Sequence, residues 1–144
     1  MTLPNPIILD WFRRTCGTWT SDQRYLLASE MRCINPNTEF TVAEGAQSNQ
    51  FITEWTGQTS GTMELELNGD ILSGSHDYFC EGATTEVGII DEDTIVFHTT
   101  CGGMKIREEI RLILDDTVRL RQVVGTCEES DQVLLTGHYT ERRI

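Results

Sequence analysis

The sequence predicts a mainly β protein: a closed antiparallel meander barrel of ten strands, preceded by one N-terminal helix. Apolar residues recur at helical spacing only at the start of the chain. Beyond Gly17, short runs of alternating polar and apolar residues follow, with turn residues every ~8–12 positions. Connections this short join antiparallel neighbours. Closing the sheet removes the two free edges that ten such strands would otherwise leave.

The helix is expected near residues 6–16. Pro6 suits the first turn of a helix, and Gly17 stands just after the expected end. Arg13 and Arg14 fall in the last turn, where positive charge is favourable. Four apolar side chains recur at helical spacing: Ile7, Ile8, Trp11 and Phe12.

The ten strands are expected at residues 18–33, 38–44, 50–57, 60–67, 71–79, 84–90, 94–100, 103–114, 117–126 and 131–142. Gly, Asn and Asp are frequent between them, and Asn68-Gly69 is the strongest single hairpin signal because both residue types tolerate positive φ. No linker, repeat or low-complexity segment interrupts the series. Residues 1–144 are therefore predicted to form one domain.

The net charge of the chain argues against nucleic-acid binding and membrane insertion. The 144 residues carry 11 Lys and Arg against 23 Asp and Glu, a formal net charge of -12. Such a chain repels phosphate backbones and anionic lipid, so no nucleic-acid partner and no membrane insertion are predicted. No apolar run approaches the ~20 residues that cross a bilayer, and the N-terminus lacks the features of a signal peptide. A cytoplasmic location is expected.

The cysteines and histidines form no metal-binding pattern. The five cysteines are odd in number and far apart, without a C-x-x-C pair, and the three histidines are equally scattered. The expectation is reduced structural cysteines and no metal site. The motifs G-x-S-x-G, H-E-x-x-H and the P-loop are absent as well.

A barrel of this kind can enclose one small ligand. Gly17-Thr18-Trp19 has the G-x-W form with which lipocalin-type barrels plug their closed end, which predicts a structural role for Trp19. Trp55 is expected near a strand end, where its ring could stack on a flat conjugated ligand; a place in the core is the alternative.

Positive charge is concentrated in one predicted hairpin. Five of the eleven cations lie between positions 105 and 121: Lys105, Arg107, Arg111, Arg119 and Arg121. One interpretation is a pocket wall that grips an anionic ligand, best a carboxylate held by guanidinium groups. The other is a solvated outer face with alternating charges.

The length of the hairpin loop decides which side chains meet. A three-residue loop, 115–117, pairs Leu114 with Val118 and sets Arg111 opposite Arg121. Two opposed arginines repel unless a carboxylate or a bound anion lies between them.

In the same register Glu109 lies diagonal to Arg121 and neutralises one of the two arginines, which leaves a surplus of positive charge. A two-residue loop would instead set the arginines beside Leu112 and Leu114 and weaken the pocket interpretation. Spacing alone therefore supports only a barrel that binds a small ligand.

The same hairpin carries a resemblance to a known family. Residues 107–112, R-E-E-I-R-L, and residues 119–125, R-L-R-Q-V-V-G, with Met104, closely resemble the S/U-type phycobiliprotein lyases of cyanobacteria and cryptophytes. Supporting matches extend over residues near 11–144, at 17–22, 24–26, 61–63 and 91–94 and at Gly137, Tyr139, Glu141, Arg142 and Ile144.

The resemblance implies a lipocalin-like, fatty-acid-binding-protein-like barrel and an enzymatic activity. Members bind phycocyanobilin or phycoerythrobilin and attach this linear tetrapyrrole through a thioether to a cysteine of an apo-phycobiliprotein. The bilin is then a substrate, and no permanent cofactor is expected. Because the acceptor supplies the thiol, the lyase needs no nucleophile of its own. The implied compartment is the cyanobacterial cytoplasm or the plastid stroma.

The resemblance also implies roles for the residues that match the family's motifs. Glu109 resembles the family's acidic group near the pyrrole nitrogens, and Arg119 and Arg121 resemble its propionate-binding arginines. Trp55 matches a pocket tryptophan, and Arg111, opposite Arg121 in the three-residue-loop register, joins the expected ligand-binding set.

Three hypotheses remain open at this point. The first is a bilin lyase that acts alone or as a homodimer. The second is a bilin-binding, weakly active or non-catalytic partner of a paralogous lyase in a heterodimer, because Gln23 and His138 depart from the family pattern. The third is a carrier of fatty acids or other small carboxylates without transfer activity.

Overall fold

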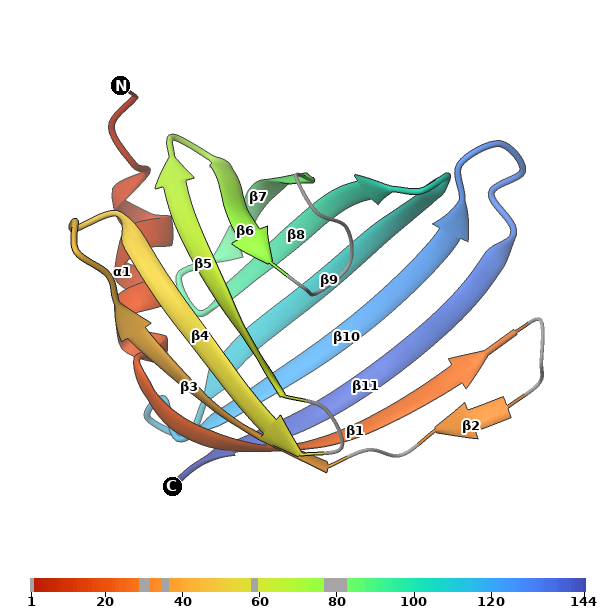
Figure 1. The fold of residues 1–144 in the computed structure, drawn as a ribbon, viewed down its shortest axis with the longest axis horizontal. Helices are drawn as coiled ribbons and strands as arrows, with labels where there is room; N and C mark the ends of the chain where they lie inside the picture. The colour runs from red at the N-terminus through yellow and green to blue at the C-terminus, as the bar shows by residue number, and fades with distance from the viewer. Residues whose placement is uncertain (1, 29–31, 35–36, 58–59, 77–82) are drawn as a thin grey trace.

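The computed structural model describes residues 2–28, 32–34, 37–57, 60–76 and 83–144 (Figure 1). One short helix lies at one end of a strongly curved antiparallel sheet. The elements are α1 (Pro6–Thr15), β1 (Gly17–Leu27), β2 (Arg32–Ile34), β3 (Asn37–Glu44), β4 (Gln50–Gly57), β5 (Gly61–Asn68), β6 (Ile71–His76), β7 (Thr84–Asp91), β8 (Thr94–Cys101), β9 (Met104–Ile113), β10 (Val118–Cys127) and β11 (Val133–Arg143).

The sheet closes on itself. From β3 to β11 each strand pairs with the next along the chain, and β11 returns to pair with β1 along most of its length. β2 and β3 both pair with β1, with Tyr25 opposite Ile34 and Asp22 opposite Asn37. Because these two pairings share one register, β2 and β3 occupy a single strand position. The predicted closed barrel of ten antiparallel strands with one N-terminal helix is confirmed.

The predicted first strand, 18–33, is wrong at its C-terminal end. β1 ends at Leu27, and the N–H of Ala28 donates to the carbonyl of Leu134 at 2.9 Å. Residues 32–34 pair back onto β1 instead of continuing it, while residues 29–31 lie outside the described part of the chain. Residues 28–33 contain no Gly or Pro, so they carry no local signal that would end the predicted strand early. Of the predicted strand 71–79, residues 77–79 also lie outside the described residues; the other strand boundaries agree within two positions.

The helix begins and ends where the residue types predict. The Asn5 side chain accepts the N–H of Ile7 at 3.0 Å and caps the first turn, and Pro6 follows as the first helical residue. The buried face consists of Ile8, Trp11, Phe12 and Thr15. Phe12 stacks on Phe51 of β4, with ring centroids 5.1 Å apart, so the helix packs directly onto the barrel interior.

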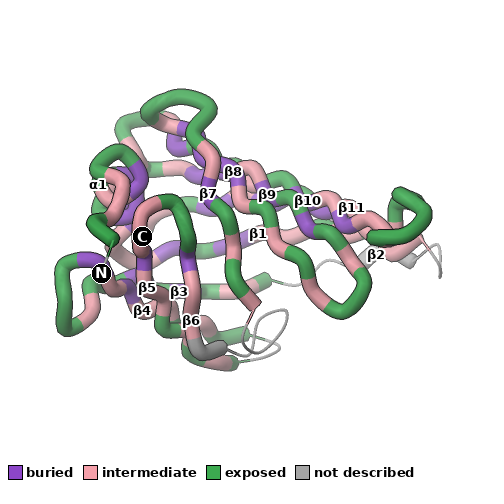
Figure 2. Tube along the Cα trace, turned by 90° about the horizontal axis from the view of Figure 1, so that it is seen from above, coloured by how far each residue is buried: buried purple, intermediate pink, exposed green. Residues whose placement is uncertain are grey.

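Buried and exposed residues alternate along the strands, as expected for a barrel with one face in and one face out (Figure 2). Trp19 is fully buried, and its Nε1 donates to the carbonyl of Thr15 at 2.9 Å. This confirms the structural role predicted for the G-x-W tryptophan, which fills the barrel next to the end of α1.

The cysteine prediction fails at one position. Cys101 is disulfide-bonded, whereas Cys16 and Cys127 are free thiols. Spacing along the chain does not show which distant segments a fold brings together, so it could not reveal this bond. In the part of the chain described here, no helix is long and apolar enough to cross a membrane.

Candidate ligand-binding site

The β9–β10 hairpin differs from its predicted register by one residue. Val118 pairs with Ile113 rather than Leu114, and Arg121 pairs with Ile110 rather than Arg111. The turn therefore contains four residues, 114–117, in place of three.

Long-range contacts to the turn explain this length. The Asp116 carboxylate accepts two hydrogen bonds from the Arg14 guanidinium, at 3.0 and 2.7 Å, and the Asp116 carbonyl accepts Arg143 Nε at 3.0 Å. Leu114, Asp115 and Asp116 all adopt positive φ, between 52° and 61°. The left-handed region is unusual for leucine, so side chains from α1 and β11 hold a backbone that local sequence does not favour.

The one-residue shift changes which charges face the cavity. Glu109 and Arg111 lie on the outer face of β9, while Glu108 and Ile110 line the interior. Arg111 is exposed, and its Nε donates to Thr94 Oγ1 at 2.9 Å. The predicted facing pair of Arg111 and Arg121 is therefore absent, and the register that placed Glu109 beside Arg121 is wrong.

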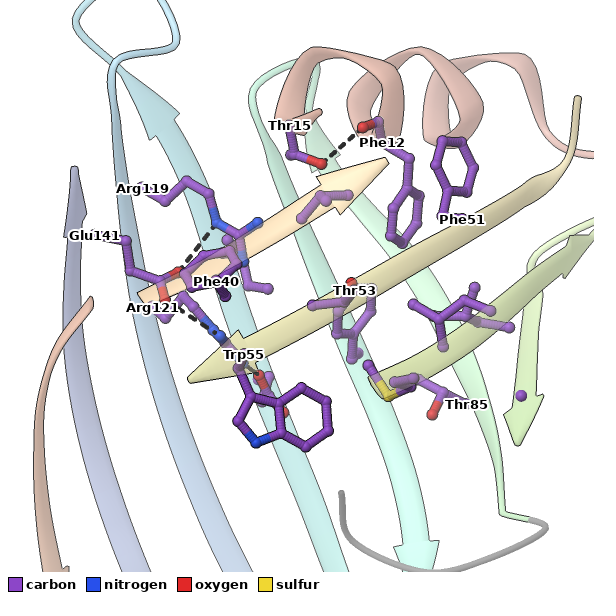
Figure 3. A pocket seen from close by; sticks show the side chains of 18 of the residues that line it. Phe12, Thr15, Phe40, Phe51, Thr53, Trp55, Thr85, Arg119, Arg121 and Glu141 are labelled. Carbon is purple, nitrogen blue, oxygen red and sulfur yellow. Dashed lines mark hydrogen bonds and ion pairs between the residues drawn. The ribbon is translucent and has the colours of Figure 1, made fainter. Parts of the chain in front are cut away.

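The two arginines of β10 do line the cavity, each paired with a buried carboxylate. Arg119 Nε lies 3.1 Å from Glu141 Oε1, and Arg121 contacts both Glu108, at 2.5 Å, and Glu141, at 3.5 Å. Figure 3 shows Arg119 and Arg121 side by side on β10, with Glu141 reaching toward both from β11. The side chain of Glu141 is completely buried. Two positive and two negative charges balance here, so the predicted surplus of positive charge does not exist in this cluster.

Arg119 is enclosed by aromatic rings. Its guanidinium carbon lies 5.2 Å from the ring centroid of Phe40, 5.6 Å from Trp19 and 5.8 Å from Trp11. Burial lowers the pKa of Arg119 below its ordinary value, while the carboxylate of Glu141 acts in the opposite direction. Cation–π contacts and this ion pair together stabilise a charge that is almost sealed from water.

Arg121 faces a more open part of the cavity. Its side chain is 13% exposed against 7% for Arg119, and its guanidinium carbon lies 4.6 Å from the Tyr139 ring. The Tyr139 hydroxyl is buried without a hydrogen-bond partner among the described residues. A buried polar atom of this kind is normally satisfied by water or by a bound molecule.

The cavity has a volume of about 450 Å³. Sites that take one small molecule span roughly 300–1,000 Å³. Its walls combine the four charged residues with aromatic rings, among them Phe12, Phe40 and Phe51. Trp55 of β4 lies against Gly61, where an added Cβ would come within 2.4 Å of the indole ring. Figure 3 shows this ring on the same side of the cavity as Arg121.

The structure thus brings together three of the five residues that the sequence singled out. Arg119, Arg121 and Trp55 line one cavity, whereas Glu109 and Arg111 do not. Sequence reasoning missed the roles of Glu108 and Glu141. With the correct hairpin register, Arg121 lies opposite Ile110, and strand alternation then places Glu108 on the same inward face. Glu141 was already among the residues that resemble the lyase family.

No metal centre is formed by the described residues: nowhere do three His, Cys, Asp or Glu side chains approach one another as ligands would. The site is an apolar chamber with one buried, electrically balanced cluster of charges. Fold and cavity together define a closed β-barrel built around a small-molecule chamber.

Solved structures of similar shape include a phycobiliprotein lyase. The S-type phycobiliprotein lyase CPES from Guillardia theta superposes with a TM-score of 0.74 at 17% sequence identity, over 95% of this chain and 92% of that one. A protein of unknown function from the DUF3598 family of Nostoc punctiforme reaches 0.67 at 12% identity over 92% of this chain, which spans only 49% of the Nostoc protein. Rv2717c from M. tuberculosis reaches 0.62 at 10% identity over 99% of both chains.

No protein-family model matches the chain, and no curated protein matches its sequence. At these identities the structural likeness establishes the fold. The similar structures include a lyase and a protein of unknown function, so the likeness does not establish what this chain does.

Proposed function

We propose that the chain is a phycobiliprotein chromophore lyase, which binds a linear tetrapyrrole in the barrel and attaches it to a cysteine of an apo-phycobiliprotein. The observation that carries this proposal is the buried cluster of Arg119, Arg121, Glu108 and Glu141 in an aromatic chamber. A bilin presents the complementary groups: a flat conjugated body, pyrrole N–H donors and two propionates. The fold shared with the Guillardia lyase supports the same conclusion.

Glu108 and Glu141 line the cavity and are held in place by arginines. Glu108 keeps a small exposed area and is assigned to the pyrrole nitrogens, whose N–H donors it can accept, while the completely buried Glu141 fixes the two arginines. A carboxylate in this position favours the protonated, extended bilin and makes its A-ring more electrophilic. In this assignment Glu108 takes the role that the sequence suggested for Glu109.

The arginines divide between two tasks. Arg121 is the better propionate contact because its side chain is the more exposed of the two and a guanidinium binds carboxylates through paired N–H donors. Arg119 anchors Glu141 from within its aromatic enclosure. Trp55 supplies a ring edge or face to the tetrapyrrole.

The transfer itself is an addition. The sulfur of the acceptor cysteine bonds to the exocyclic carbon of the A-ring, the carbon–carbon double bond is consumed, and the thiol proton ends on the tetrapyrrole. Nothing is oxidised and no group leaves, so the chain needs neither a nucleophile nor a permanent cofactor. Its contribution is to hold and orient the bilin.

The charges of the chamber argue against a carrier of fatty acids. A fatty acid has no N–H donor to offer the Glu108 carboxylate that lines the cavity, whereas a bilin brings four nitrogens. The remaining alternative is a bilin-binding, non-catalytic partner of a paralogous lyase, since the same cluster serves binding without transfer. The proposal includes assembly as a homodimer or as a heterodimer with a paralogue. It also includes a location in the cyanobacterial cytoplasm or the plastid stroma.

Co-expression tests the proposal. The chain is produced with a bilin-forming pathway and each apo-phycobiliprotein subunit, alone and with paralogues, and covalent colour is measured after denaturation. We expect one subunit to gain colour beyond the control that lacks the chain. Bilin absorbance bound to the chain without transfer in any combination would support the non-catalytic alternative, and neither binding nor transfer would refute both.

A further inference from the structure

The outer surface of the barrel is electrically divided. No Lys or Arg occurs between Arg32 and Lys105, so the strands from β3 to β8 contain none. Outward-facing carboxylates follow these strands: Glu39, Glu54, Glu64, Glu66 and Glu86. We call this surface the acidic wall.

The opposite surface collects exposed arginines. It consists of the outward-facing residues of β9, β10, β11 and β1, and we call it the arginine wall. Its cations are Lys105, Arg107, Arg111, Arg142 and Arg24. Two carboxylates, Glu109 and Asp22, lie among them, so in a chain of net charge -12 this wall is positive.

The arginines of this wall are available to a partner. Arg24 is 74% exposed and Arg107 is 48% exposed, and each lies 3.9 Å from its nearest carboxylate. Ion pairs this long and this exposed contribute little. Arg142 is exposed and forms no ion pair with any described residue.

An apolar centre accompanies the charges. Leu120 is 41% exposed, lies opposite Arg111 on β9 and Thr140 on β11, and has Arg142 as a diagonal neighbour. Leu26, on the same wall, is 37% exposed. An exposed leucine with arginines as cross-strand neighbours has the composition of protein–protein interfaces, in which Arg is enriched.

We infer that the arginine wall docks an acidic surface of the acceptor protein; this inference rests on the proposed function. Nucleic acid is disfavoured by the net charge and by the carboxylates Glu109 and Asp22. A twofold contact between two copies would oppose positive walls. A head-to-tail contact between the two walls would link copies into a ring or an open chain. A different protein with an acidic face would pair with the arginines of this wall, without repulsion between two positive walls and without linking copies of this chain.

The test measures docking separately from chromophore chemistry. Each apo-phycobiliprotein subunit is immobilised without bilin, and association of the chain is recorded at about 50 mM and about 300 mM salt, where screening differs strongly. The double variant Arg24→Gln with Arg142→Gln lowers the net charge by two units. The matched control, Thr56→Glu with Thr62→Glu, makes the same change on exposed positions of the acidic wall.

The arginine-wall variant should associate about fivefold or more slowly at low salt and lose most of its salt dependence, whereas the control should stay within about twofold of wild type. Leu120→Asn should accelerate dissociation. Equal behaviour of the two double variants, no binding to any apo-subunit, or a loss of self-association in sedimentation would each overturn the inference.

Bilin titration and covalent colour are recorded for the same proteins. Docking that depends on the arginine wall, without colour, would leave the inference standing and refute the lyase activity. If the arginine-wall variant and the control transfer colour equally fast, the lyase activity would stand and the docking inference would be refuted.

Discussion

Arg119 and Arg121 lie two residues apart on β10, yet their surroundings differ. Arg119 sits among Trp11, Trp19 and Phe40, while Arg121 borders the open part of the cavity. Arg119 is therefore suited to stabilising the barrel, and Arg121 is suited to contacting a ligand.

Alanine at each position should separate the two roles. Arg121→Ala should weaken bilin binding about 10- to 150-fold, the equivalent of a charged hydrogen bond worth ~1.5–3 kcal/mol, and should also lower the free energy of unfolding because the buried Glu108 loses its arginine partner. Arg119→Ala should lower the free energy of unfolding by ~3–5 kcal/mol, because it leaves Glu141 buried without its closest partner. Bilin titration and urea unfolding give the two readings, with the exposed Arg13→Ala as control. Equal bilin affinity in Arg121→Ala and the control would remove Arg121 from the site.

Adjacent glutamates on β9 provide a matched pair for the acidic role. Glu108→Gln removes a carboxylate from the cavity, and Glu109→Gln removes one from the outer face. The bilin bound to Glu108→Gln should shift toward its neutral, bluer and weaker absorbance, while Glu109→Gln should keep the wild-type spectrum. Absorbance of the purified complexes checks this. A spectral change in Glu109→Gln alone would restore the assignment suggested by the sequence.

At the scale of elements, the turn between β9 and β10 determines which face of each strand lines the cavity. A one-residue change in register exchanges the inward and outward sets of a strand. The four-residue turn is fastened by Arg14 from the helix, whose two hydrogen bonds to Asp116 hold the pKa of that carboxyl below its usual range. The same contact raises the pKa of Arg14.

This contact should appear as a pH-dependent part of the stability. Because the folded-state pKa of Asp116 is lowered, its contribution is present above the unfolded-state value of ~3.9 and is lost as the pH falls through the folded-state value. Asp116→Asn should cost about 1 kcal/mol at neutral pH and much less near pH 3. Asp115→Asn, a neighbour that also has positive φ, is the control. Urea unfolding at both pH values measures the difference, and an equal cost at both would mean that the charge of Asp116 is irrelevant.

The local sequence pattern was sufficient to predict the helix and the strands, but not the side-chain contacts between them. Alternation and turn residues predicted the barrel and the helix, and the position of Trp19 followed from G-x-W. The placement of Arg119 and Arg121 in a cavity wall was predicted as one of two interpretations. The turn length depends on Arg14, which is 102 residues from Asp116, and no local pattern contains that information.

The carboxylates show the same limit. Glu141 comes from β11, twenty positions beyond Arg121, and meets it only because the strands pair in a particular register. Cys101 likewise needed the fold before its disulfide could be identified. Strand patterns specify which side chains share a face, whereas the partners across the barrel depend on turns that are fixed from elsewhere.

At the scale of the whole molecule, acidic charge opposes folding. The 23 acidic residues exceed the 11 basic ones, and the acidic wall holds Glu54 diagonal to both Glu39 and Glu64 on the flanking strands. Like charges at such separations repel, and salt screens them over a Debye length of ~10 Å at 0.1 M. No Lys or Arg lies on β3, β4 or β5 to relieve this repulsion.

The unfolding temperature of the chain without ligand should therefore rise as salt is increased from about 10 mM to about 300 mM at neutral pH, by a few degrees. Glu54→Lys, which replaces the central repulsion by attraction to two neighbours, should raise the unfolding temperature at low salt and flatten its salt dependence. Glu54→Gln should give an intermediate result, since it removes the repulsion without adding attraction. Calorimetry at several sodium chloride concentrations measures all three proteins. An unfolding temperature that falls with salt would show that attractive pairs such as Arg14–Asp116 dominate the electrostatics of folding, and the acidic wall would then carry no cost.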